Sequence, residues 1–228
     1  DKEHKACYKK YDKVICVSKS VLDVYKQKFD LENGIVCYNP VDSHELKKYK
    51  KEYQIQDKVK ICCVGRLEDQ KGFDRLIKIL GKLKLKNYVL DIYGIGTMKD
   101  ELDKMIQKYG LEDSVRLKGF QKNIYEAMSN YHLLISPSRA EGFSLVVAEA
   151  MCMGLPVLST DCAGPNELTD YGKYGIVVEN SDEALENAIQ NIFEKKEALY
   201  KYHKLSEERS NIFKIENVMK EIEGNIYE

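Results

Sequence analysis

Two loops of this 228-residue chain combine charged side chains with glycines at a spacing that suits an anionic ligand. The first loop follows an apolar run and holds Arg66 and Lys71 between Gly65 and Gly72. Arginine can clamp phosphate oxygens with two parallel hydrogen bonds, lysine adds a point charge, and glycine lets the backbone come close. An isolated Arg and Lys at a helix start are more often solvated charges, but the flanking glycines favour a polyphosphate site.

The second loop, within residues 136–150, holds the two glutamates Glu141 and Glu149. Between them, the amides from Gly142 to Leu145 are expected at a helix N-terminus, where the helix dipole attracts anions. If both glutamates were helical, they would lie about 12 Å apart along the axis. That distance exceeds the roughly 5 to 9.5 Å between carboxylates that flank one glycosidic bond. We therefore expect the two glutamates to contact different parts of one elongated ligand.

Each glutamate also has an ordinary structural interpretation. In that interpretation Glu141 stabilises the start of the helix and Glu149 is a paired charge on its surface. Glu149, however, stands among apolar neighbours, between Val147-Ala148 and Ala150-Met151. A carboxylate in such surroundings requires a buried partner. Glu149 is therefore the stronger anomaly of the two.

Two further loops follow expected strands but carry weaker signals. Gly94 and Gly96 begin a pattern like the dinucleotide-binding fingerprint, but Lys99 stands where its third glycine is required, so a Rossmann dehydrogenase is disfavoured. Gly119 and Phe120 offer a backbone edge and an aromatic ring to a nucleotide base. A single phenylalanine is more often a packing residue than a stacking platform.

Short β-branched runs alternate with helical stretches, which is typical of an α/β fold with a parallel sheet. Most runs are continuously apolar, as expected for strands that are covered on both faces. The expected strands are residues 13–17, 35–38, 60–64, 88–93, 114–117, 132–136, 156–159 and 175–178. Apolar spacing predicts core helices over 73–83 and 185–192, and Ser18 is the expected N-cap of a helix through Phe29. A basic stripe at helical spacing predicts a mostly solvated face: Lys71, Arg75, Lys78 and Lys82.

Composition excludes several classes of protein. The 36 Lys and Arg nearly balance the 37 Asp and Glu, and the resulting net charge of −1 gives the chain no overall attraction for nucleic acid. The seven cysteines stand mostly in apolar strings and predict buried reduced thiols. No Cys-x-x-Cys or His-Glu-x-x-His occurs, so we expect no metal site. No apolar run is long enough to span a membrane, and the start resembles neither a signal peptide nor an initiator Met. We therefore expect a cytoplasmic fragment.

Taken together and in their order along the chain, these sequence motifs resemble the donor-binding half of the retaining family 4 glycosyltransferases, which have GT-B architecture. The resemblance rests on Gly65-Arg66-Leu67 with Lys71-Gly72, on residues 141–151, and on Gly154-Leu155-Pro156-Val157, and it spans about Val36 to Asn180. It implies a Rossmann-like parallel sheet flanked by helices. It also implies that residues 1–40 end a preceding acceptor domain and its linker, that 41–212 form the donor-binding domain, and that 213–228 form a C-terminal helix.

The resemblance assigns roles to matching positions. Arg66 and Lys71 are implied to hold the diphosphate of a nucleotide-sugar, Glu149 to accept from the ribose hydroxyls, and Glu141 to reach the donor sugar. The implied catalytic residues are Glu141, Arg66 and Lys71. The implied donor-binding residues are Gly65, Arg66, Lys71, Gly94, Gly119, Phe120, Gly142, Phe143, Ser144, Leu145 and Glu149. Two fixed cations replace a metal in such a site, so no metal and no cofactor are expected.

The predicted function is therefore transfer of a sugar from a UDP- or GDP-sugar to a glycan or lipid-linked acceptor. The family's acceptor domain, with its glycine-rich loop, would precede residue 1, so we expect this chain alone to be inactive. A non-catalytic nucleotide-binding module of the same fold is the alternative, and an epimerase or phosphorylase relative ranks third. No nucleic-acid partner is expected, and peripheral contact with the inner face of the membrane is left open.

Overall fold

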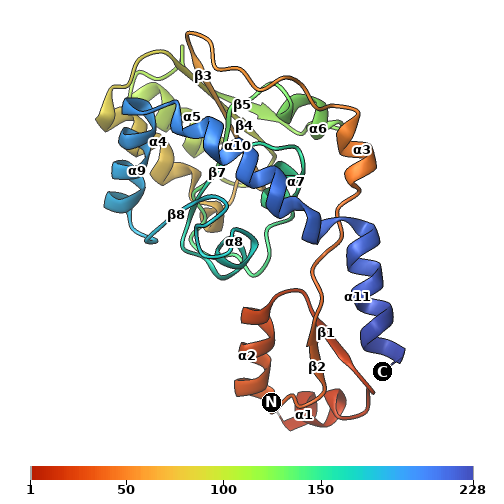
Figure 1. Ribbon diagram of the computed structural model, residues 1–228. Coiled ribbons are helices and arrows are strands. Elements are labelled where there is room, and N and C mark those ends of the chain that lie inside the picture. Colours follow the sequence, from red (N-terminus) through yellow and green to blue (C-terminus); the bar gives the residue numbers. More distant parts are fainter. Residues whose placement is uncertain (1, 228) are drawn as a thin grey trace.

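The computed structural model describes residues 2–227 and contains two sheets (Figure 1). A six-stranded sheet with helices on both faces forms the main body. A smaller unit near the N-terminus contains α1 (Lys2–Tyr8), β1 (Val14–Cys16), α2 (Lys19–Phe29) and β2 (Gly34–Val36), in which β1 and β2 pair in parallel. The chain then crosses to the main body through residues 37–42.

The main sheet is parallel throughout, and its strands stand in the order β5-β4-β3-β6-β7-β8. The strands are β3 (Val59–Val64), β4 (Tyr88–Tyr93), β5 (Val115–Gly119), β6 (Leu133–Ser136), β7 (Val157–Thr160) and β8 (Ile176–Val178). Counted from β3 as the first strand, this is the doubly wound order 3-2-1-4-5-6. The winding direction reverses between β3 and β6, and such sheets bind ligands at the carboxyl ends of the strands at that point.

Helices cover both faces because the strands are apolar on both. Ile61 and Cys63 of β3 pack in one core with α4 (Phe73–Leu83), α5 (Lys99–Lys108) and α9 (Asp182–Glu194). Cys62 lies in a second core with α7 (Leu145–Cys152) and the short helices α3 and α6. The shorter helices and 3-10 turns are α3 (Ser43–Lys47), η1 (Asp69–Lys71), α6 (Ile124–Met128), α8 (Ala163–Leu168) and η2 (Ser210–Phe213).

The last two helices return the chain to the small unit. Helix α10 (Ala198–Arg209) packs along α7, and α11 (Ile215–Tyr227) extends away from the main body toward β1 and β2 (Figure 1). The outgoing and returning segments meet where Val41 pairs with Lys214, and the Val41 amide donates to the Phe213 carbonyl at 2.7 Å. The small unit and the main body are thus joined by two adjacent crossings.

All eight expected strands are present, and the expected α/β class with a parallel sheet is confirmed. Ser18 caps α2 by accepting from the Val21 amide at 3.2 Å, as predicted. The solvated basic stripe was wrong at two positions. Lys71 lies in η1 and pairs with Glu141, with its side chain only 18% exposed, and the Arg75 side chain is buried and donates to Asp182 and Asn180. All seven cysteines are free and six are buried, but Cys7 is exposed, contrary to expectation.

The part of the chain that the structure describes contains no helix of the length and apolarity that crossing a membrane requires. Within the same residues, no three His, Cys, Asp or Glu side chains gather in a way that could hold a metal ion.

Candidate functional site

The loops that follow β3, β4 and β5 join at the carboxyl edge of the sheet. The Gly65 amide donates to the Tyr93 carbonyl at 2.9 Å, and the Gly94 amide donates to the Gly119 carbonyl at 2.8 Å. Gly94 has a φ of 143°, and a Cβ atom there would lie 1.8 Å from the Gly65 carbonyl oxygen. Only glycine fits this approach. Three of the predicted glycines therefore shape one continuous backbone wall.

The loop after β3 also packs against the loop after β6. Gly72 ends η1 and begins α4 with a φ of 67°, and a Cβ atom there would lie 2.0 Å from the Pro137 carbonyl oxygen. The Arg139 amide donates to the Gln70 carbonyl at 2.8 Å. Because β3 and β6 are neighbours at the reversal of winding, this contact lies where the topology places a ligand.

This packing brings Lys71 and Glu141 into an ion pair. The side chains are only 18% and 8% exposed, and Ser138 Oγ donates to Glu141 Oε1 at 2.9 Å. Two residues to which the resemblance gave separate roles are thus in direct contact. Sequence reasoning did not find this pair, because it depends on the packing of two distant loops.

Arg66 extends from the same wall into solvent. Its side chain is exposed, and no ion pair involves it among the residues that the structure describes. A second arginine of the region, Arg139, is already engaged, since it donates to Asp74 with both terminal nitrogens at 2.8 and 2.7 Å. Arg66 is therefore the arginine that can turn toward an anion.

The N-terminus of α7 supplies further donors. Ser144 occupies the N-cap position, and its carbonyl accepts from the Val147 amide at 3.1 Å, so only the amides of Leu145 and Val146 have no acceptor within the helix. A serine at an N-cap usually accepts from such an amide, but the Ser144 hydroxyl makes no capping bond. It is buried, 3% exposed, and without a hydrogen-bond partner. A helix N-terminus suits an anion, and the donors that remain here are the Ser144 hydroxyl and the amides of Leu145 and Val146.

Glu149 has the buried partner that its apolar neighbours require. Tyr125 Oη donates to Glu149 Oε1 at 2.9 Å. Burial raises the pKa of the Glu149 carboxyl above its usual range, and the bond from Tyr125 opposes this effect. Since Glu141 precedes α7 and Glu149 is its fifth residue, the helical distance calculated for two helical glutamates does not apply.

Phe120 follows β5 at the far side of this edge. Its ring is 74% exposed, so the ordinary expectation that a lone phenylalanine packs in the core is wrong here. The adjacent Gly119 has a φ of 68° and open space around its Cβ position. The ring is free to stack on a planar ligand.

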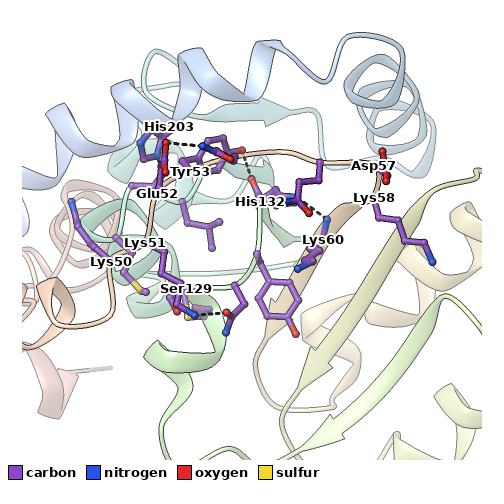
Figure 2. A pocket seen from close by; sticks show the side chains of 18 residues that line it. Lys50, Lys51, Glu52, Tyr53, Asp57, Lys58, Lys60, Ser129, His132 and His203 are labelled. Atoms are coloured by element: carbon purple, nitrogen blue, oxygen red, sulfur yellow. Dashed lines mark hydrogen bonds between the residues drawn. The ribbon is translucent and has the colours of Figure 1, made fainter.

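A hollow of about 630 Å³ opens at the opposite, amino edge of the sheet (Figure 2). Its lining includes Lys58 and Lys60 at the start of β3 and His132 immediately before β6. Tyr53 stacks on His203 with ring centroids 4.5 Å apart. Parallel strands place their amino and carboxyl ends at opposite edges, and none of the predicted donor residues lines this hollow. The hollow is therefore separate from the candidate site.

The family described as Glycosyl transferases group 1 matches residues 30–210. The chain belongs to this family. Its fold agrees with solved GT-B glycosyltransferases: a Staphylococcus aureus TarM variant, crystallised with fondaparinux, alpha-GlcNAc-glycerol and UDP, superposes with a TM-score of 0.84. That comparison has 25% identity and covers 99% of this chain and 46% of the other. The Anabaena protein HepE, in complex with UDP and glucose, has a TM-score of 0.80 at 22% identity, covering 100% of this chain and 68% of that one.

Two curated relatives share about a third of their aligned residues with this chain. The Campylobacter jejuni N-acetylgalactosamine-N,N'-diacetylbacillosaminyl-diphospho-undecaprenol 4-alpha-N-acetylgalactosaminyltransferase is 33% identical over 180 residues, covering 77% of this chain and 49% of its own length. The Staphylococcus aureus poly(ribitol-phosphate) alpha-N-acetylglucosaminyltransferase is 32% identical over 162 residues, covering 70% of this chain and 32% of its own length. The chain thus spans half or less of the length of these two relatives.

Proposed function

We propose that this chain is the donor-binding half of a retaining, family 4 glycosyltransferase and that its donor is a UDP-sugar. The observation that carries the proposal is the convergence of Arg66, Lys71 and the N-terminus of α7 at one edge of the sheet, at the reversal of winding. Fixed cations and free amides in one place suit a diphosphate. The presence of UDP in the TarM and HepE structures favours uridine over guanosine.

In this proposal the two cations act on the leaving group. As the bond between the anomeric carbon and the diphosphate oxygen breaks, negative charge grows on the diphosphate. Arg66 and Lys71 stabilise that charge more in the transition state than in the ground state, which accelerates the reaction. The α7 amides and the Ser144 hydroxyl add hydrogen bonds to the same phosphate oxygens. Because the cations are part of the chain, we propose that no metal ion is required.

The two glutamates divide the rest of the donor between them. Glu141, at the entrance of α7, faces the sugar and stabilises the positive charge that develops on its ring. Glu149, one turn inside α7 and held by Tyr125, accepts hydrogen bonds from the ribose hydroxyls. Phe120 and the open backbone at Gly119 receive the base.

The acceptor is proposed to be a glycan or a lipid-linked sugar, in keeping with the named activity of the Campylobacter relative. We propose that the small unit within residues 2–40 belongs to the domain that binds this acceptor, and that α11 returns to it. This chain alone would then bind nucleotide without completing a transfer. Contact with a membrane surface would be peripheral.

A transfer assay separates this proposal from a non-catalytic nucleotide-binding module. The chain is incubated with UDP-N-acetylglucosamine or UDP-N-acetylgalactosamine and an undecaprenyl-diphosphate-linked acceptor, once alone and once as part of a longer protein that includes the preceding segment. The proposal expects nucleotide binding in both and sugar transfer only in the longer protein. Absence of transfer in both, with nucleotide binding intact, would favour the binding module.

A further inference from the structure

A buried carboxylate outside the predicted donor residues joins the main body to the small N-terminal unit. Glu167 belongs to α8 and is 7% exposed. Its oxygens accept from the Lys19 amide at 2.7 and 2.9 Å, from the Ser20 amide at 3.3 Å and from Tyr38 Oη at 3.0 Å. All three donors lie in the N-terminal segment, whereas Glu167 lies about 130 or more positions away in the main body.

Every donor at this contact suits a carboxylate acceptor. The first amides of a helix have no acceptor within the helix, and they lie at the positive end of its dipole. Glu167 therefore satisfies the N-terminus of α2, an 11-residue helix, from outside. Burial, and then the neighbouring Glu167 carboxylate, raise the pKa of Tyr38, so the phenol remains a donor. A buried carboxylate without these partners would be costly, so Glu167 favours the docked arrangement.

The same contact reaches the donor loop, which is the segment 137–144 between β6 and α7, from both sides. Ser18 Oγ, at the cap of α2, donates to the Gly142 carbonyl at 3.1 Å. From the other side, the Gly164 amide of α8 donates to the Glu141 carbonyl at 3.0 Å, and a Cβ atom at Gly164 would lie 2.7 Å from Phe143 Cα. The backbone that carries Glu141 is thus held between α8 and the cap of α2.

We propose that Glu167 is a positioning residue that latches α2 onto α8 and thereby fixes the donor loop at Glu141 and Gly142. Tyr38 lies on the outgoing crossing, whereas the bonds from Lys19 and Ser20 lie apart from the pairing of Val41 with Lys214, so α2 can undock from Glu167 while that pairing persists. The link to nucleotide binding rests on the proposed function, whereas the latch itself does not. By thermodynamic linkage, undocking α2 weakens nucleotide binding by the same factor by which nucleotide strengthens docking.

Hydrogen exchange and calorimetry on the 228-residue chain test the latch, with Glu167→Gln and the milder Tyr38→Phe as variants. Gln keeps the shape but loses the charge that two amides and a phenol share. We expect the amides of Lys19 and Ser20 to exchange about tenfold faster in Glu167→Gln, with a smaller rise in Tyr38→Phe. The amide of Gly164, which donates to the donor loop, should also exchange faster. The Kd for UDP should rise about fivefold or more.

Glu186→Gln is the matched control, because it breaks the ion pair with Lys82 in the main body without touching α2 or the donor loop. It should change neither the exchange at Lys19 and Ser20 nor the Kd for UDP.

Unchanged α2 exchange in both Glu167→Gln and Tyr38→Phe would overturn the latch. Faster α2 exchange with unchanged Gly164 exchange would overturn the coupling to the donor loop. If the parent chain binds no UDP, the proposed function fails, while the exchange of Lys19, Ser20 and Gly164 still decides the latch. Should Glu167→Gln not fold, Tyr38→Phe decides it by the same readouts.

Discussion

The Lys71 ammonium and the Glu141 carboxylate pair across two loops that are 70 positions apart in sequence. The pair is largely buried, with side chains 18% and 8% exposed. Before the donor binds, the positive charge of Lys71 is therefore already offset by Glu141. In the proposed function, a bare diphosphate must compete with this carboxylate for the lysine, whereas a complete donor also offers Glu141 a sugar ring that becomes positive as the diphosphate leaves.

Glu141→Gln should therefore separate binding from catalysis. Loss of the carboxylate removes a negative charge beside the diphosphate site and leaves Lys71 without its ionic partner. We expect the Kd for bare UDP to be unchanged or to fall, by up to about tenfold, while kcat of the longer transferase falls by about 100-fold or more. Calorimetry with UDP and a steady-state transfer assay measure the two quantities.

Lys71→Ala provides the opposite control for this pair. It removes the cation and leaves a buried carboxylate near the phosphates, so it should weaken UDP binding. If Glu141→Gln weakened the binding of bare UDP as much as Lys71→Ala does, Glu141 would act on the nucleotide and the proposed division of roles would be wrong.

The raised pKa of Glu149 predicts a pH dependence of nucleotide binding. Burial favours the protonated acid, so this carboxyl gains its proton at a higher pH than an exposed glutamate does. In the proposed site, a protonated Glu149 would be a weaker acceptor for the ribose hydroxyls. We expect the affinity for UDP to fall as the pH is lowered from 7.5 toward 5. The difference between the parent chain and Glu149→Gln should shrink over the same range, which calorimetry at several pH values measures.

The contribution of Glu149 to the stability of the chain should depend on pH in the opposite direction to its contribution to UDP binding. A carboxyl whose folded pKa is raised binds protons more tightly in the folded state, so its contribution to the free energy of unfolding increases as the pH falls toward the ordinary glutamate value. At pH 7.5, Glu149→Gln should therefore be at least as stable as the parent chain in urea unfolding. A marked destabilisation at pH 7.5 would indicate that the charged carboxylate is a structural requirement.

Phe120→Ala should weaken the binding of nucleotides but not the binding of pyrophosphate. The exposed ring can stack on a base, and loss of such a platform typically costs about 1–3 kcal/mol. We expect this loss in the affinity for UDP and none in the affinity for pyrophosphate. Because the ring is 74% exposed, the free energy of unfolding should change by less than about 0.5 kcal/mol. Tyr171→Ala removes a ring that is 73% exposed elsewhere and should leave UDP binding unchanged.

How much of this was predictable depends on the range of the interactions. The main-sheet strands were predicted because runs such as Ile61-Cys62-Cys63 must be buried on both faces, which is visible in the sequence. The helix at Ser43–Lys47 was missed because it is a single turn among polar residues, held by Asp42, which accepts from two of its amides. It has no apolar periodicity to reveal it.

The candidate residues were predicted by type and motif, but their partners were not. The pairing of Lys71 with Glu141 and the latch at Glu167 join segments 70 and about 130 or more positions apart, and no local pattern specifies such contacts. Arg75 looked like one residue of a solvated stripe, and its burial depends on Asp182 of a distant helix. The apolar neighbours of Glu149 predict that it has a buried partner, but they do not identify that partner as Tyr125.

A chelator tests the proposal that the fixed cations replace a metal. Addition of EDTA should leave the Kd for UDP and the turnover of the longer transferase within about twofold of their values, since Arg66 and Lys71 belong to the chain. Restoration of a lost activity by magnesium or manganese would contradict this proposal.

The most direct test of the central claim is titration of this chain with UDP by calorimetry, comparing the parent chain with Arg66→Ala. Arg66 is exposed and unpaired in the described part of the chain, so its loss should leave the fold intact. Removal of one hydrogen bond to a charged group costs about 1.5–3 kcal/mol, a rise in Kd of roughly 10- to 150-fold. Lys78→Ala, at an exposed position on α4, is the control and should bind as the parent does. Saturable binding that Arg66→Ala weakens to this extent is the predicted result, and no binding, or equal binding by the parent chain and Arg66→Ala, would contradict the account.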